Sequence, residues 1–293
     1  ISIMISIKNI RNQKINLSTL TETLFYCFPL SFIIGNLAVT LNLLFFIIFS
    51  AFLIKREKLN FRFNSSIWLL VVFFSYLFIS TTIQFLFLDS FHLAKLNWSL
   101  AQDPILKSIA LIRFPILVFL VDTLFYNKIL NLKKFFLSTF FCTTFVSFDV
   151  IFQYFVGFDL FGYKSFGDRN PGPFGDEWIA GSYLQKFSFF SIFFICSISK
   201  NKNFKNLTTI FVIVLHFIAI FLAGNRMPVL LFLFGFVLII LLIKNFRIIF
   251  SSSLLISMVL IFFILGNDSP LKRNFVHFIN QINIFEIINV TKD

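Results

Sequence analysis

The chain alternates long apolar runs with short polar breaks along almost its whole length. Most of the runs reach the roughly 17–25 residues that a helix needs to cross the hydrocarbon core of a membrane. In lipid each run must be helical, because backbone N–H and C=O groups find no water there. The pattern therefore predicts an all-α polytopic integral membrane protein with about nine transmembrane helices, at residues 17–34, 37–54, 66–88, 104–125, 135–156, 182–199, 207–223, 229–243 and 248–266.

The first two runs are separated only by Gly35 and Asn36, which predicts a tight hairpin of two spans. A single long tilted helix followed by an interfacial segment is the alternative. The other runs are joined by short loops, and no hydrophilic domain or clear internal repeat interrupts them. A single membrane domain over residues 1–293 is therefore the simplest organisation.

Composition supports the membrane class. The chain is 58% hydrophobic and 13% charged, against about 25% charged residues in a soluble domain, and its mean hydropathy is +0.91. The three cysteines, Cys27, Cys142 and Cys196, all lie in apolar runs, which indicates small buried side chains and neither a disulfide framework nor a metal site.

The cations predict an orientation, because Lys and Arg concentrate in cytoplasmic loops. Alternate loops carry most of them: Lys8, Arg11 and Lys14; Lys55, Arg56, Lys58 and Arg62; Lys128, Lys133 and Lys134; Lys200, Lys202 and Lys205; Lys244 and Arg247. The amino terminus is thus predicted to be cytoplasmic, with 157–181, 224–228 and 267–293 outside. The net charge of +12 is explained by this topology, so we expect no nucleic-acid partner.

Two charged residues lie inside predicted spans. Arg113 is about nine residues and Asp149 about seven residues from the outer end of its helix, roughly 10–14 Å deep at 1.5 Å per residue. An ionisable group at that depth normally has a partner, so we expect Arg113 and Asp149 to pair between adjacent helices. The pair would either fix helix packing or form the floor of a substrate cavity.

Two polar islands interrupt the apolar pattern on the predicted outer side: residues 149–184, rich in Gly and Pro, and residues 224–226. Arg169 and Arg226 lie there beside Gly or Pro, although positive charge is disfavoured outside. Arg offers a planar fork of donors suited to phosphate oxygens, and a helix starting near Arg226 would add free N–H groups. The islands therefore predict a pyrophosphate clamp. Alternatively, both arginines are interfacial anchors or partners of Asp168, Asp176 or Glu177.

Other chemistries lack a signature. No His, Cys or carboxylate set has metal-ligand spacing, and the chain holds no nucleotide-binding loop of the G-x-x-x-x-G-K type and no serine elbow, so we predict no metal and no cofactor. His216 lies in mid-span, where a lone His is usually packed and hydrogen-bonded.

Residues 28–230 contain a series of short motifs whose order and spacing can be compared with known families. These motifs are Phe28-Pro29-Leu30-Ser31 with Gly35-Asn36; Arg113-Phe114; Asp149 to Gly162 with Gln153 and Gly157; Arg169 to Leu184; and Gly224-Asn225-Arg226-Met227. In this order and spacing the chain resembles the O-antigen ligase / O-antigen polymerase family of polytopic membrane glycosyltransferases. The resemblance implies a metal-independent inverting glycosyl transfer at the periplasmic face of the bacterial inner membrane.

In such an enzyme the donor would be a glycan on undecaprenyl pyrophosphate, and the acceptor a glycolipid such as lipid A–core or another lipid-linked glycan. The resemblance implies that Arg169 and Arg226 bind the donor pyrophosphate. A base must deprotonate the acceptor hydroxyl, and Asp176 or Glu177 is the candidate, although Glu177 could instead orient Arg169. Trp178 and Tyr183 could stack on sugar or anchor the interface.

The chain departs from the family near its end. Family members use a His in a large external loop further along, followed by more spans, whereas here His277 lies in the right compartment without the surrounding motif. We therefore expect part of the catalytic apparatus to be missing. Two alternatives stay open: a transporter or flippase for a lipid-linked or anionic solute, and a fragment without activity. The sequence leaves ligase and polymerase undistinguished, along with the glycan and the oligomeric state.

Overall fold

A computed structural model describes residues 16–61, 65–91, 108–198 and 201–264. It groups the chain into two compact units. The first consists of Ile1–Phe25 and Thr40–Asn131, and the second of Tyr26–Val39 and Leu132–Asp293. The prediction of a single membrane domain over residues 1–293 stays a prediction, and each unit is described by itself below.

The described residues form an all-α membrane protein, as predicted. Five helices are long and apolar enough to cross a membrane: α4 (Asn36–Glu57), Ser108–Tyr126 including α7 (Arg113–Tyr126), α8 (Leu132–Val156), α10 (Lys202–Leu222) and α12 (Arg247–Ile264). The pair α2 (Leu17–Tyr26) and α3 (Phe28–Ile34) makes a sixth if it is one bent span. Shorter apolar helices are Ile67–Ile83 within α5 (Ser65–Phe91), and α11 (Arg226–Leu242).

Each predicted apolar run overlaps a helix or the bent pair within the described residues, and the run at 182–199 corresponds to α9 (Ala180–Ile198). The number of nine spans and the cytoplasmic amino terminus stay predictions. Residues 104–107 of the fourth run, His92 and the segment 267–293 with His277 lie outside the described residues.

The breaks near the amino terminus have local causes. Gly35 separates α3 from α4 with φ +128°, a backbone conformation that side-chain-bearing residues rarely adopt. The chain therefore breaks at the predicted position. A second break at Cys27 was not predicted, although its signal is present: Pro29 stands in the first turn of α3, where its missing N–H costs nothing, whereas it would disrupt a continuous helix.

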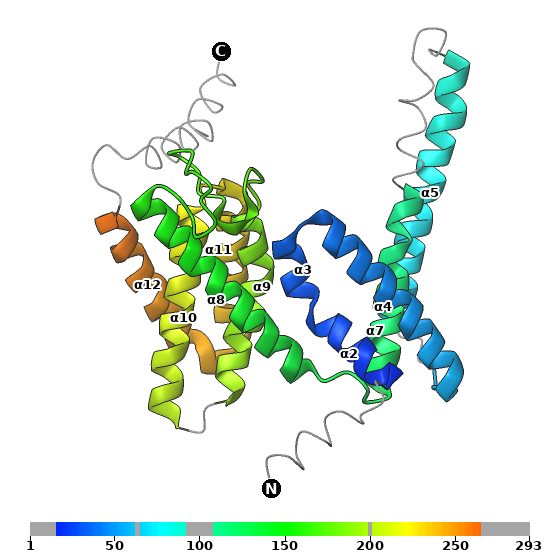
Figure 1. The fold of residues 1–293 in the computed structure, drawn as a ribbon, viewed down its shortest axis with the longest axis horizontal. Coiled ribbons are helices and arrows are strands. Elements are labelled where there is room, and N and C mark those ends of the chain that lie inside the picture. The colour runs from blue at the N-terminus through cyan, green and yellow to red at the C-terminus, as the bar shows by residue number, and fades with distance from the viewer. Residues whose placement is uncertain (1–15, 62–64, 92–107, 199–200, 265–293) are drawn as a thin grey trace, which may run out of the picture. The chain divides into compact units, whose positions relative to one another are not determined.

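In the second unit, α8 to α12 run up and down side by side, so that each helix is antiparallel to the next in the chain (Figure 1). Two short 3₁₀ turns complete it, η1 (Gly172–Phe174) before α9 and η2 (Lys244–Phe246) before α12. Turns of a few residues join α10 and α12 to the two ends of α11, which favours the antiparallel order.

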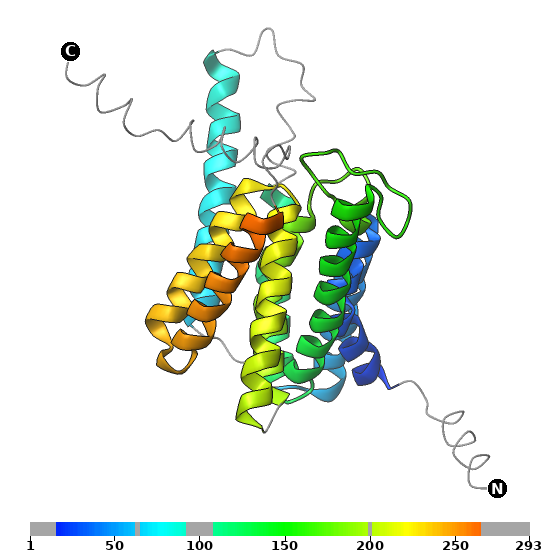
Figure 2. The same cartoon turned by 90° about the vertical axis from the view of Figure 1, so that its left-hand side faces the viewer.

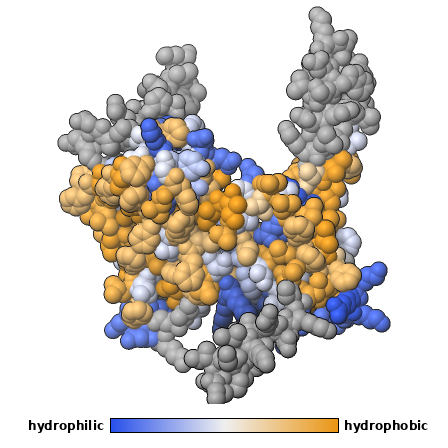
Figure 3. All heavy atoms as spheres, viewed as in Figure 1, coloured by the Kyte–Doolittle hydropathy of each residue, from blue (hydrophilic) through white to orange (hydrophobic). Residues whose placement is uncertain are grey.

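The core of this unit is built from phenylalanine rings. Phe232 of α11 lies with its ring centroid 5.0 Å from Phe189 and 4.8 Å from Phe236, and Phe236 lies 4.9 Å from Phe250 of α12. The visible face of the bundle is apolar along the helices and hydrophilic at their ends (Figure 3). That distribution suits helices whose outer faces contact lipid.

The first unit contains the larger part of α4 together with α5 and α7. The hydroxyl of Thr81 in α5 donates to the Ser108 hydroxyl, 3.2 Å away, which ties α5 to the start of the helix that includes α7. Exposed apolar side chains such as Trp68, Leu69 and Val72 cover α5. This is the surface expected of a helix in lipid.

Candidate functional site

The polar segment between α8 and α9, here the 157–179 loop, covers one end of the second unit. Figures 1 and 2 show this loop at the end where α8 stops and α9 starts, and the turn between α10 and α11 at the same end. The two polar islands of the sequence therefore lie together, although about 40 residues separate them in the chain.

The loop is held from below by two buried polar side chains of α8. Gln153 is fully buried; its Nε2 donates to the carbonyl of Tyr163, 3.1 Å away, and its Oε1 accepts the N–H of Gly172, 2.8 Å away. One helical turn earlier, Asp149 accepts the N–H of Leu160 at 2.9 Å. Both halves of the loop are therefore fastened to α8 through hydrogen bonds between these side chains and the loop backbone.

Within the loop, Asp159 forms a turn of its own. Its Oδ1 accepts the N–H groups of Phe161, at 3.0 Å, and of Tyr163. The loop also packs closely on α8, because a Cβ at Gly172 would lie 2.8 Å from Cγ2 of Val150 at φ +58°. The glycine is needed at this position for both reasons.

The α10–α11 turn, residues 223–225, is joined to the loop by side-chain amides. Asn170, fully buried, donates to the carbonyl of Leu222 at 2.6 Å and accepts from the Ser165 hydroxyl at 2.8 Å. Asn225 donates to the carbonyl of Trp178 at 2.6 Å. A Cβ at Gly224 would overlap the carbonyl oxygen of Asp168 and lie 3.2 Å from Cα of Arg169. The two islands thus form one cross-linked structure.

Arg169 is oriented within this structure by an aromatic ring. Its guanidinium carbon lies 4.0 Å from the ring centroid of Trp178, and its Nε lies 3.9 Å from Oδ2 of Asp168. Its side chain is 34% exposed. Stacking fixes the plane of the fork while leaving its edge available to an anion.

Arg226 begins α11 and is half-buried. The preceding residue, Asn225, is the N-cap; its side chain makes no capping hydrogen bond to the helix, and its Nδ2 donates to the carbonyl of Trp178. Pro228 brings no N–H to this first turn. The positive end of the α11 dipole therefore lies beside Arg226 and next to the Asp168–Arg169 backbone.

The two candidate bases lie in the same loop, and both Asp176 and Glu177 are exposed. Oε1 of Glu177 accepts from Nδ2 of Asn36, 3.4 Å away, so this carboxylate contacts the start of α4. Asp168 and Trp178 contact Arg169 directly, and an orienting role for Glu177 stays a prediction. Trp178 itself is 48% exposed and contacts Phe166 edge-on.

Arg113 and Asp149 belong to different units, and their pairing stays a prediction. In the first unit Arg113 is exposed at the start of α7, with its guanidinium 5.2 Å from the Phe114 ring centroid. In the second, Asp149 is fully buried beneath the loop, and its Oδ2 has no hydrogen-bond partner among the described residues. The side chain of Asp149 is committed to holding Leu160 in place.

Tyr183 is not available to stack on a sugar. It is only 4% exposed, and its hydroxyl donates to the carbonyl of Pro29, 3.0 Å away. The ring lies 5.5 Å from that of Phe174 in the loop, centroid to centroid. Tyr183 therefore helps to support the site from inside by joining α9 to α3.

His216 is packed and hydrogen-bonded in the core of the bundle, as expected. Its Nδ1 lies 2.8 Å from the Ser147 hydroxyl of α8, and its Nε2 lies 3.0 Å from the Ser191 hydroxyl of α9. Thr143 adds a longer contact of 3.4 Å to Nε2. The cluster joins three helices below the loop and gives the site a rigid base.

Sequence reasoning missed the cross-linking asparagines. Asn170 stands before Pro171 in a glycine-rich stretch, where an exposed turn residue is the usual interpretation. Its burial depends on the arrival of Leu222 from α10, which no local pattern in the sequence reveals. Gln153 and Asn225 were noted as motif members, but their bonds to the loop were not predicted.

Comparison with known family models, with curated proteins and with solved structures finds no match to this chain. The functional assignment therefore depends on the residues and contacts described above.

Proposed function

We propose that the chain is a membrane glycosyltransferase of the O-antigen ligase or polymerase type. Its substrate is a glycan carried on undecaprenyl pyrophosphate, and the pyrophosphate binds to Arg169, Arg226 and the amino-terminal end of α11. The acceptor is a glycolipid, and the reaction needs neither metal nor cofactor.

One observation carries the proposal: the backbone of Asp168 and Arg169 lies directly against Gly224, two residues before Arg226. A pair of cations separated by more than 50 residues in the chain is thereby brought to one end of the bundle. Surface cations that only mark topology need no such contact, and they need no asparagines that link the two segments.

The chemistry requires charge stabilisation on a leaving group. In an inverting transfer the acceptor oxygen forms its bond to the anomeric carbon as the bond to the pyrophosphate oxygen breaks, and negative charge grows on the pyrophosphate. Two guanidinium groups and helix N–H donors that are already in position lower the energy of that state. The Trp178 ring, 4.0 Å from the guanidinium carbon, limits the freedom of Arg169 and so supports this role.

The proton of the acceptor hydroxyl passes to a carboxylate. Asp176 is exposed in the loop that holds Arg169, and Glu177 follows it. We assign the base to this pair. With nine spans and a cytoplasmic amino terminus, the site would face the periplasm from the bacterial inner membrane.

A carrier of the same lipid-linked glycan is the second candidate, because polar groups do lie inside the bundle. His216 is fully buried, and the buried hydroxyls of Ser147, Ser191 and Thr143 each lie within hydrogen-bond distance of its ring nitrogens. A transport path needs polar groups that face a water-filled cavity, so this satisfied cluster favours a structural role.

The proposal is tested by complementation of a surface-glycan-deficient bacterial strain with the gene and its variants. Arg169→Ala and Arg226→Ala should each reduce glycan transfer by about 10²–10³-fold. Lys164→Ala, which removes an exposed cation of the same loop, should change it by about twofold or less. Normal glycan from both arginine variants would reject the clamp. A glycolipid that crosses vesicle membranes unchanged, with no transfer product, would favour the carrier.

A further inference from the structure

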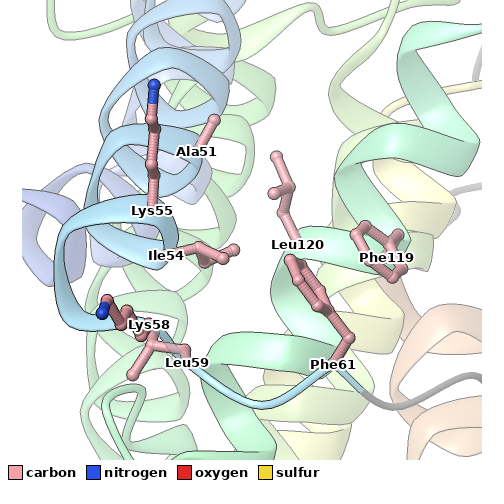
Figure 4. Close-up of a pocket in the computed structure, with 8 residues that line it drawn as sticks. All are labelled: Ala51, Ile54, Lys55, Lys58, Leu59, Phe61, Phe119 and Leu120. Carbon is pink, nitrogen blue, oxygen red and sulfur yellow. The ribbon is translucent and has the colours of Figure 1, made fainter.

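A groove in the first unit separates α4 from α7 and lies far along the chain from the residues of the proposed clamp. Its volume is about 540 Å³, within the range of about 300–1,000 Å³ that small-molecule sites occupy. Figure 4 shows Ile54 of α4 pointing toward Leu120 of α7, with the rings of Phe61 and Phe119 along one side. These side chains, with Leu59, make the lining apolar.

The linker after α4 holds the groove in shape. The N–H of Leu59 donates to the carbonyl of Ile54 at 3.1 Å while Lys58 has φ +48°, which is the left-handed ending of a Schellman motif. Nδ2 of Asn127 then donates to the carbonyl of Asn60 at 3.1 Å, tying the linker to the end of α7. The end wall of the groove is thus fixed by hydrogen bonds.

An aromatic stack closes the same end. The rings of Phe61 and Phe119 lie 5.7 Å apart, centroid to centroid, with 14° between their planes. Phe61 is 59% exposed, while Ile54 and Leu120 at the bottom of the groove are buried. The groove therefore has an apolar floor that is accessible from one side.

Two lysines stand at the edge of the groove, and in Figure 4 the amine of Lys55 lies on the side of Ala51 while that of Lys58 points outward. Lys55 and Lys58 contribute to its lining, and both are exposed. At the end of α7 the N–H of Ile129 donates to the carbonyl of Leu124 at 3.0 Å, and Lys128 has φ +59°, so a second helix ends with a left-handed lysine beside the first. An apolar groove with lysines at its edge has the chemistry to bind an amphiphile that carries an anionic headgroup.

We propose that this groove binds a phospholipid, with an acyl chain against Ile54, Leu120 and Phe119 and an anionic headgroup at Lys55 and Lys58. Because α4 is apolar and long enough to span the membrane, its basic last turn lies at headgroup level. Basic pockets between membrane helices bind anionic lipid headgroups in this way. A partner helix in the groove would instead need acidic side chains opposite the lysines.

Native mass spectrometry of the full purified chain with phosphatidylglycerol or phosphatidylcholine tests the proposal. The wild type should bind phosphatidylglycerol about 10–30-fold more tightly than phosphatidylcholine, since each lysine near the headgroup contributes roughly fivefold. Lys55→Gln with Lys58→Gln should remove that preference. Lys205→Gln with Lys244→Gln, which removes two cations elsewhere, should keep it.

A second variant separates the acyl chain from the headgroup. Ala51 lines the groove, so Ala51→Trp should fill it and weaken both lipids, while thermal unfolding reports whether the variant is folded. Equal binding of the two lipids by the wild type would overturn the proposal. So would an unchanged preference in the double lysine variant, or a co-purified polypeptide that occupies the groove in place of lipid.

Discussion

The 157–179 loop and the α4–α7 groove both place cations next to apolar surface, but they are built differently. In the loop, Gln153, Asn170 and Asn225 are committed to backbone groups of other segments. In the groove, the walls are held by backbone turns and by the stacked rings of Phe61 and Phe119. Lys55 and Lys58 are exposed to solvent.

This difference separates recognition by geometry from recognition by charge. Arg169 is stacked on Trp178 at 4.0 Å, so the direction of its donors is fixed. Lys55 and Lys58 are exposed ends of flexible chains, for which any cation near the headgroup serves equally well. The loop should therefore respond to small changes of shape, and the groove only to loss of charge or of space.

The largest expected effect comes from Gly224→Ala, which attacks the geometry of the loop directly. A Cβ there overlaps the carbonyl of Asp168 at φ +78°, so strain and overpacking together should cost about 2–5 kcal/mol of stability. Gly162→Ala is the matched control: φ is +89°, but the space is open, and the cost should be about 1–2 kcal/mol. Thermal unfolding in detergent measures both, and equal losses would contradict the close contact.

The next effect separates the two kinds of cation. Arg169→Lys keeps the charge but loses the planar fork and its stacking, so glycan transfer should fall about 10–100-fold, or about 1.5–3 kcal/mol. Lys55→Arg with Lys58→Arg should leave phosphatidylglycerol binding within about threefold, because charge is conserved. Unchanged glycan transfer by Arg169→Lys would show that the loop, like the groove, recognises its ligand by charge alone.

The sequence predicted the helices better than the loop, for a physical reason. An apolar run must be a helix in lipid whatever its neighbours are, so the positions of α8, α10 and α12 follow from composition along the chain. The break at Gly35 follows in the same way from a local backbone requirement.

Contacts between segments that are distant in the chain could not be predicted from the sequence. The sequence predicts that Arg169 and Arg226 meet at a shared pyrophosphate, whereas the contact between their segments in the structure is made by Gly224 and Asn170. Tyr183 was considered for sugar binding because exposed and buried aromatic residues look alike in a phenylalanine-rich chain. The division into two units likewise depends on tertiary packing, which the continuous pattern of apolar runs does not encode.

Asn170→Ala should have an intermediate effect. It leaves the carbonyl of Leu222 and the hydroxyl of Ser165 without their partner in a buried place, at a cost of about 1–3 kcal/mol. Since the loop then loses its bond to α10, glycan transfer should fall along with thermal stability. Asn203→Ala, at an exposed position of α10, should change stability by about 0.5 kcal/mol or less. A similar result for both variants would mean that the loop is held without Asn170.

The smallest effect is expected at the groove, where Asn127→Ala removes the side-chain bond to the linker. The bond is exposed, so stability should fall by only about 0.5–1.5 kcal/mol. Phosphatidylglycerol binding should weaken slightly, because the lysines and the apolar floor remain in place. Asn60→Ala is the control, since Asn60 contributes only its backbone carbonyl to this bond, and it should be nearly neutral. If Asn127→Ala instead lost lipid binding as completely as Ala51→Trp, the groove would depend on fixed hydrogen-bond geometry, and the contrast with the 157–179 loop would disappear.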